Sequence, residues 1–244
     1  MTTIEGTRPD VVRTVKYPVY ERFYTWQGEG VHLGRAAYFI RLYGCPQACP
    51  WCDSAGTWHK DYRPEGVTLM TAVDLATMVA QDSPDGAFVV ITGGEPILFN
   101  LGPLVNELHA LGRRVHIETS GIAELRGNID WVTLSPKPFG TWPTPEVVAR
   151  ADEVKIIVHD VADIQAGLDT LTGLKPAAVI WLHPEWSKAR ERDAAVLNAI
   201  TDAVKANPRL RAGYQMHKLY RADELDAHSD KRLIPLGGNT ELGY

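Results

Sequence analysis

The sequence predicts an α/β fold, a partial or modified βα barrel of the TIM type. Short runs of β-branched and aromatic residues alternate along the 244 residues with longer segments of helical periodicity, as in repeated βα units around a parallel sheet. No linker-like segment divides the chain, and 45% hydrophobic with 23% charged residues is typical of a globular core. We expect one domain over residues 1–244, with an N-terminal extension over 1–35 and an irregular tail over 219–244, where periodicity fades.

Seven segments have the composition of strands. In chain order they are residues 37–43, 88–92, 114–119, 131–135, 154–158, 178–183 and 213–217. Four segments between them have helical periodicity: 71–81, 101–111, 161–171 and 187–207. Thr71 with Asp74 is typical of a helix N-cap, and Gly112 of a helix C-terminus.

Polar residues follow six of the predicted strands. The segments are GGEP, ETSG, SPK, HD, HPE and QMHK. In a parallel barrel the C-terminal ends of the strands share one face, so these residues can meet over one ligand. Any single segment is better explained as a turn. Six together indicate a binding site.

All three cysteines of the chain, Cys45, Cys49 and Cys52, lie within eight consecutive positions. Three thiolates from one loop can hold three irons of a 4Fe-4S cluster and leave the fourth iron open to another ligand. One alternative is a zinc site completed by His59 or another histidine; another is a chance grouping of free thiols. No second Cys or His pair has a convincing zinc spacing, so we favour the cluster.

Composition also narrows the partners and the location. The N-terminus has neither a basic segment nor an apolar signal core, and no apolar run is long enough to cross a bilayer. We therefore expect a cytoplasmic protein without a membrane partner, and in that reducing compartment clustered cysteines favour metal chemistry over disulfides. A net charge of −5 argues against nucleic acid and for a small-molecule partner.

The cysteine spacing, followed by GGEP at 93–96, resembles the radical S-adenosylmethionine superfamily. The resemblance implies a radical SAM type of barrel, with Cys45, Cys49 and Cys52 binding the 4Fe-4S cluster. It also implies that the methionine group of S-adenosylmethionine chelates the open iron and that the GGEP strand end receives its amino group.

From Gln27 to Lys218 the chain also resembles the 7-carboxy-7-deazaguanine synthases, because Gln27, Gly28, Glu29 and Arg41 match that family, as do WCDS, TGGEP, ETSG, SPK and QMHK in order. The resemblance implies radical ring contraction of 6-carboxy-5,6,7,8-tetrahydropterin to 7-carboxy-7-deazaguanine with loss of ammonia, a step toward queuosine. It further implies magnesium, a homodimer, and a flavodoxin- or ferredoxin-type electron donor.

The resemblance and the side-chain chemistry together assign the site. Substrate-binding residues are Trp26, Gln27, Gly28, Glu29, Arg41, Thr92, Glu118 and His217. Residues along S-adenosylmethionine are Gly93, Gly94, Glu95, Ser135, Pro136, Lys137, Gln215, Met216, His217 and Lys218. An amide and a carboxylate can read the flat edge of a pterin, and the Arg41 guanidinium can pair with the substrate carboxylate. Without the cysteine cluster, a surface salt bridge would be the better explanation of Arg41, and an ordinary turn the better explanation of residues 27–30.

Two features depart from the family pattern. The family often has Cys-Asp-Thr after the last cluster ligand, with the threonine hydroxyl on magnesium, whereas this chain has Cys52-Asp53-Ser54. Serine keeps the hydroxyl, so we expect Ser54 to bind magnesium, with an N-cap as its alternative role. The tail after Lys218 is longer than in members whose C-terminal carboxylate lies near the substrate, which leaves the role of Tyr244 undefined.

Two other functions fit part of the pattern. Within the superfamily, an activase that installs a glycyl radical on a partner protein shares the cysteine loop and the small size. In a different class, a non-catalytic iron-sulfur or zinc protein would share the cysteines. The polar strand ends argue against the second, because a carrier needs no substrate cavity.

Overall fold

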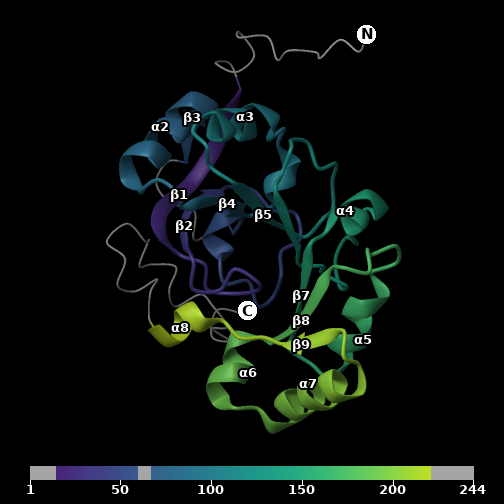
Figure 1. The fold of residues 1–244 in the computed structure, drawn as a ribbon. Coiled ribbons are helices and arrows are strands. Elements are labelled where there is room, and N and C mark those ends of the chain that lie inside the picture. The colour runs from purple at the N-terminus through teal and green to yellow at the C-terminus, as the bar shows by residue number, and fades with distance from the viewer. Residues whose placement is uncertain (1–14, 60–66, 221–244) are drawn as a thin grey trace.

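The fold is an open, curved sheet of nine strands with helices around its outside (Figure 1), seen in a computed structural model that describes residues 15–59 and 67–220. The strand order is β3-β1-β2-β4-β5-β6-β7-β8-β9. The strands are β1 (Lys16–Trp26), β2 (Ala36–Leu42), β3 (Thr68–Thr71), β4 (Phe88–Gly93), β5 (Val115–Thr119), β6 (Trp131–Leu134), β7 (Glu153–Val158), β8 (Val179–Pro184) and β9 (Leu210–Ala212). β2 and β4 to β9 are parallel, and β1 pairs antiparallel with both β2 and β3. The prediction of a partial barrel is confirmed.

The helices connect the parallel strands. They are α2 (Ala72–Asp82), α3 (Gly102–Ala110), α4 (Pro145–Arg150), α5 (Ala162–Asp169), α6 (Trp186–Glu191), α7 (Ala194–Ala206) and α8 (Met216–Tyr220), with short 3₁₀ turns at Ala55–Thr57 and Pro96–Leu98. A large apolar cluster lies between the sheet and these helices, and Ile91, Leu104 and Ile117 are fully buried in it. Because helices cover the outer face, the parallel strands are continuous apolar runs, as in Phe88 to Ile91.

Two predicted elements are wrong at the C-terminal end of the fold. The strand expected at 213–217 lies earlier, as β9, and Met216 already belongs to α8. Gly213 packs so closely on the His183 ring that a Cβ there would lie 2.2 Å from Nε2, and the chain turns away at this point. The helix expected at 187–207 is two helices, because Arg192 adopts a left-handed conformation and Asp193 caps α7 through the N–H groups of Ala195 and Val196.

Four strands and helices were not predicted: β1, β3, α4 and α8. β1 lies within the expected N-terminal extension, and its burial is mixed along its length instead of strictly alternating. Residues 1–14 of that extension and 221–244 of the expected tail, including Tyr244, lie outside the described residues. Leu219 and Tyr220 form the last turn of α8.

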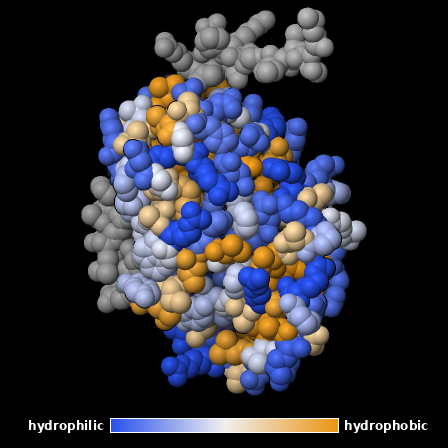
Figure 2. Space-filling model, viewed as in Figure 1, coloured by the Kyte–Doolittle hydropathy of each residue, from blue (hydrophilic) through white to orange (hydrophobic). Residues whose placement is uncertain are grey.

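On the face shown in Figure 2, hydrophilic residues cover most of the described surface, and hydrophobic residues form a band across its middle. No helix in the described part of the chain is long and apolar enough to cross a membrane.

The predicted N-cap of α2 is confirmed and provides a test of local stability. The Asp74 N–H donates to Thr71 Oγ1 at 3.2 Å, and the Thr71 N–H donates to Asp74 Oδ2 at 3.2 Å, a reciprocal capping box. We expect Thr71→Ala to lower the free energy of unfolding by about 1 kcal/mol in anaerobic denaturant titrations. Thr77→Ala, on the exposed face of the same helix, should change it by less than about 0.5 kcal/mol. Equal effects of the two substitutions would contradict the capping role.

Candidate active site

A cavity of about 280 Å³ lies at the C-terminal ends of the parallel strands. It is lined by the loop after β1, the cysteine loop after β2, and the ends of β4, β5, β7 and β8. Of the residues assigned above, the structure brings all to this cavity except Pro136 and Met216. Five of the six polar segments contribute residues to this cavity, whereas His159 and Asp160 of the sixth do not. Segments separated by most of the chain therefore meet there.

Cys45, Cys49 and Cys52 are free thiols along one side of the cavity. Burial raises the pKa of Cys49 to about 11 and that of Cys52 to about 12, so the thiolates need a nearby positive charge to form at neutral pH. Bound iron supplies that charge. The Ser54 N–H already donates to Cys52 Sγ at 3.4 Å, a contact that stabilises a coordinated sulfur.

Among the described residues, no three His, Cys, Asp or Glu side chains converge on a point where one metal ion would sit. A cluster with four irons binds each thiolate through a different iron, so it does not require such convergence. The donor set therefore fits the cluster, and the zinc alternative gains no support from the geometry.

The cysteine loop contacts the end of β4 through backbone atoms. The Glu95 N–H donates to the Gly44 carbonyl at 2.7 Å. A Cβ on Gly94 would lie 2.2 Å from that same oxygen, so only glycine fits here. This contact places Cys45 directly beside the GGEP segment.

Both carboxylate oxygens of Glu95 accept hydrogen bonds from other groups of the protein. Oε1 accepts from Thr119 Oγ1 at 2.5 Å and from the Ile97 N–H at 3.3 Å, and Oε2 accepts from both the N–H and the hydroxyl of Ser120. The carboxylate thus connects the ends of β4 and β5. Its direct contact with S-adenosylmethionine stays a prediction.

Gln47, between the first two cysteines, was not singled out in the sequence. Its Nε2 donates to Ser120 Oγ at 3.3 Å and to the Thr141 carbonyl at 2.8 Å, and its Oε1 accepts from the Thr141 N–H at 2.9 Å. One buried amide therefore ties the cysteine loop to the loops after β5 and β6. No local sequence signal distinguishes this glutamine from an exposed one.

On the β6 loop, Lys137 Nζ donates to Ser135 Oγ at 2.6 Å and lies 5.4 Å from the Trp51 ring centroid. The lysine thus faces the cysteine loop, which carries Trp51. Thr92, at the end of β4, is buried and lines the same cavity. These positions fit a bound cofactor that spans the two loops.

The segment from Gln27 to Val31 is held by contacts from distant strands. Glu153 Oε2 accepts from the Val31 N–H at 2.8 Å, and a Cβ on Gly30 would lie 2.6 Å from that oxygen. On the other side, the Met216 N–H donates to the Gly28 carbonyl at 3.0 Å. A Cβ on Gly28 would lie 2.1 Å from Nδ1 of His217, so α8 packs directly on this loop. Both glycines are required by close approach.

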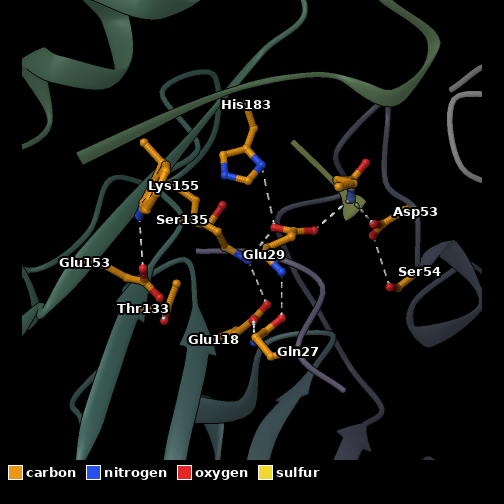
Figure 3. A network of polar contacts seen from close by, with 12 residues as sticks. Gln27, Glu29, Asp53, Ser54, Glu118, Thr133, Ser135, Glu153, Lys155 and His183 are labelled. Atoms are coloured by element: carbon orange, nitrogen blue, oxygen red, sulfur yellow. Dashed lines mark hydrogen bonds and ion pairs between the residues drawn. The ribbon is translucent and has the colours of Figure 1, made fainter. Parts of the chain in front are cut away.

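A network of charged and amide groups lies at the base of the cavity, with Glu29 in its middle (Figure 3). Lys155 Nζ donates to Glu29 Oε2 at 2.8 Å and to Glu118 Oε2 at 3.0 Å. Gln27 Nε2 donates to Glu118 Oε1 at 2.9 Å, and Gln215 Nε2 donates to Glu29 Oε1 at 3.0 Å. Two predicted carboxylates and two predicted amides are thus joined by a lysine that was not predicted.

Electrostatics within the network follow from burial and from the lysine. Burial alone would raise the pKa of Glu29, but Lys155, His183 and His217 outweigh it and hold that pKa well below its usual range. The two carboxylates likewise raise the pKa of Lys155 against the effect of burial. Burial lowers the pKa of His183 to about 4, so this imidazole is neutral at neutral pH.

Arg41 and Ser54 lie together at the C-terminal end of the cysteine loop. Arg41 Nε donates to Glu21 Oε1 at 2.6 Å, and Nη1 donates to Ser54 Oγ at 2.9 Å. Ser54 stands at the N-cap of the turn Ala55–Thr57, but its side chain makes no capping hydrogen bond. Its hydroxyl donates to Asp53 Oδ1 at 3.2 Å instead, so the hydroxyl and a carboxylate are side by side.

Three residues in and around the network were missed in the sequence: Glu153, Lys155 and His183. Glu153 accepts from the Trp131 and Trp181 indoles at 3.1 Å each and from the Thr133 hydroxyl at 2.8 Å. His183 is completely buried, and neither ring nitrogen has a hydrogen-bond partner within the described chain. The signal for Glu153 and Lys155 was available, because charged residues are rarely buried in a strand unless they are paired.

The fold and the cysteine loop are those of a radical SAM domain, and the Radical SAM superfamily model matches residues 39–139. The chain is 40% identical over 173 residues to the 7-carboxy-7-deazaguanine synthase of Synechocystis, covering 71% of this chain and 80% of that one. It is 37% identical over 226 residues to the same enzyme of Escherichia coli K12, covering 84% and 98%. The crystal structure of QueE from Escherichia coli has a TM-score of 0.73 at 32% identity and covers 88% of this chain and 100% of that one.

The chain belongs to the 7-carboxy-7-deazaguanine synthase family. It is accordingly a radical SAM enzyme, a class whose cofactors are a 4Fe-4S cluster and S-adenosylmethionine. The predictions of the superfamily and of the family are confirmed, whereas the roles of individual residues remain predictions.

The cysteine loop gives a direct test of the cluster. Anaerobically reconstituted protein should contain about four irons per chain, and Cys45→Ala, Cys49→Ala or Cys52→Ala should each abolish the broad visible absorbance. Iron analysis and absorbance spectra measure both. Ser83→Ala, a buried serine distant from the loop, should keep the full iron content. Stoichiometric zinc without iron would contradict the assignment.

Proposed function

We propose that this protein converts 6-carboxy-5,6,7,8-tetrahydropterin to 7-carboxy-7-deazaguanine with loss of ammonia, as a step in deazapurine biosynthesis. The observation that carries the proposal is one cavity that combines the cysteine loop with a pterin-sized set of acceptors at Gln27, Glu29 and Glu118. Family membership supports the same reaction, since the relatives are named for that product.

The chain's own groups suit the two ends of such a substrate. Oxygens of Gln27, Glu29 and Glu118 accept hydrogen bonds, and the amino group and ring N–H of a pterin donate them. Arg41, fixed by Glu21, offers a guanidinium beside the cysteine loop for the substrate carboxylate. The substrate is thereby oriented with its carboxylate toward the cysteine loop.

We infer that Cys45, Cys49 and Cys52 hold the cluster and that Gly93, Gly94, Ser135 and Lys137 line the place of S-adenosylmethionine. When bound, this pair supplies an electron and then a 5′-deoxyadenosyl radical, chemistry that belongs to the cofactor. The protein's part is to hold the substrate carbon near that radical and to exclude water. Trp51, Trp58 and Trp186 on the cavity wall serve the second purpose.

We propose that magnesium binds at Ser54 Oγ, with Asp53 nearby and the substrate carboxylate completing the site. Magnesium prefers oxygen ligands and keeps several waters, so few protein groups suffice. The proximity of the Ser54 hydroxyl to Asp53, together with its lack of a capping role, supports this placement. A homodimer and a flavodoxin- or ferredoxin-type electron donor, which rest on the family resemblance, complete the proposal together with the cytoplasmic location expected from the composition.

Substitution of Ser54 tests the magnesium site. Ser54→Ala removes an oxygen ligand and no thiolate, so the magnesium concentration for half-maximal turnover should rise at least about tenfold while iron content is unchanged. Ser54→Thr keeps the hydroxyl and serves as the matched control, with a titration close to that of the wild type. An unchanged titration in Ser54→Ala would show that magnesium binds elsewhere.

The fate of S-adenosylmethionine tests the reaction itself. The substrate has the atoms of the product plus ammonia, so no oxidant is consumed and the cofactor can be re-formed in every cycle. With limiting S-adenosylmethionine we expect deazaguanine product and ammonia in excess over cofactor, measured by chromatography and an ammonia assay. One-to-one consumption, or transfer of a radical to a glycine of a partner protein, would instead identify a glycyl-radical activase.

A further inference from the structure

Lys155 is an unusual residue for its position. It lies on β7, between β6 and β8, and its side chain is only 7% exposed. Its ammonium contacts two carboxylates that come from the β1–β2 loop and from β5. A buried lysine with two partly buried carboxylates is costly to desolvate and leaves one net negative charge. Stability alone does not explain such a group, because apolar residues would fill the space equally well.

The pattern of hydrogen bonds shows what the lysine does to its neighbours. Its ammonium donates to one oxygen of Glu29 and to one oxygen of Glu118. The Gln215 amide donates to the other oxygen of Glu29, and the Gln27 amide donates to the other oxygen of Glu118. Each carboxylate oxygen has two lone pairs, so both groups still have acceptor capacity toward the cavity that they line. The ammonium thus bridges two carboxylates from different elements and helps to hold the pKa of Glu29 below its usual range.

Other charged groups around the pair do not replace the lysine. His183 approaches Glu29 Oε2 only to 3.9 Å and is neutral, whereas His217 and Asp53 face Glu29 from α8 and the cysteine loop. Arg41 lies near Glu118 but is paired with Glu21. Lys155 is the cation in direct contact with both carboxylates.

We propose that Lys155 is a positioning and specificity-determining residue, which holds Glu29 and Glu118 as a pair of charged acceptors so that the cavity selects a substrate edge rich in hydrogen-bond donors. This inference rests on the proposed pterin substrate. A 2-aminopterin presents that edge, whereas a 2-oxo analogue, a lumazine, places an acceptor where the amino group stands. Without the lysine, burial favours the protonated form of Glu29, whose carboxyl group can then donate to that oxygen.

The test compares Lys155→Met with wild-type holoenzyme. We expect wild type to prefer the carboxytetrahydropterin over the corresponding tetrahydrolumazine by about a hundredfold or more in kcat/KM, and Lys155→Met to reduce this preference at least about tenfold, through KM more than through kcat. Lys155→Arg keeps the charge and should recover most of the wild-type preference for the pterin. Lys175→Met, which breaks a lysine–aspartate pair outside the cavity, should retain the wild-type preference.

A second readout does not depend on any substrate. In wild type the lowered pKa of Glu29 means that its charged form stabilises the fold above about pH 4, and that this stability is lost only below that value. In Lys155→Met, burial makes Glu29 bind its proton more tightly when folded than when unfolded, so stability falls as pH rises. The difference in thermal midpoint between wild type and Lys155→Met should therefore widen from about pH 5 to about pH 8. The difference between wild type and Lys175→Met should stay constant over the same range.

The two readouts separate the possible failures. If wild type does not turn over the carboxytetrahydropterin but the midpoints diverge with pH, the proposed function fails and the electrostatic role stands. If wild type is active and Lys155→Met keeps both its preference for the pterin and a constant midpoint difference, the inference is wrong. If Lys155→Met does not fold, the same two measurements are made on Lys155→Gln, which retains hydrogen-bond donors but carries no charge.

Discussion

The backbone contact between Gly44 and the Gly94–Glu95 peptide is the constraint on which the rest of the site depends. It leaves no room for a side chain at Gly94 and brings the residue before the first cysteine against the end of β4. Glu95 then joins β4 to β5, and Gln47 joins the cysteine loop to the loops after β5 and β6. The position of the thiols relative to three strand ends is therefore set by short contacts within the protein, before any cofactor binds.

Around this fixed rim the cavity is organised by charge. Its carboxylates at Glu29 and Glu118 share one ammonium, and the Arg41 guanidinium lies beside the cysteine loop with Nη1 on the Ser54 hydroxyl. Hydrogen-bond acceptors and a cation therefore line the same cavity. A molecule with a donor-rich ring and an acidic substituent matches both, which is why the polar network and the cysteine loop point to the same substrate.

Local pattern was enough to predict the parallel strands, because runs such as Phe88 to Ile91 are apolar on both faces in a covered sheet. It was also enough for the cap at Thr71, which depends on residues three apart. It failed for β9 and for the break at Arg192, where a close approach to His183 and an aspartate cap override propensity. Lys155 was passed over because its neighbours in the sequence are apolar and its partners, Glu29 and Glu118, lie on other elements.

The hydrogen bond from Gln215 to Glu29 joins residues 186 positions apart. Contacts of such separation form late in folding, since the entropy of closing a long loop must be overcome before they contribute. The sheet and the cysteine loop depend on shorter connections, so they can form while the segment leading into α8 is still undocked. The packing of that segment on Gly28 is therefore the step that completes the wall of the cavity around Glu29.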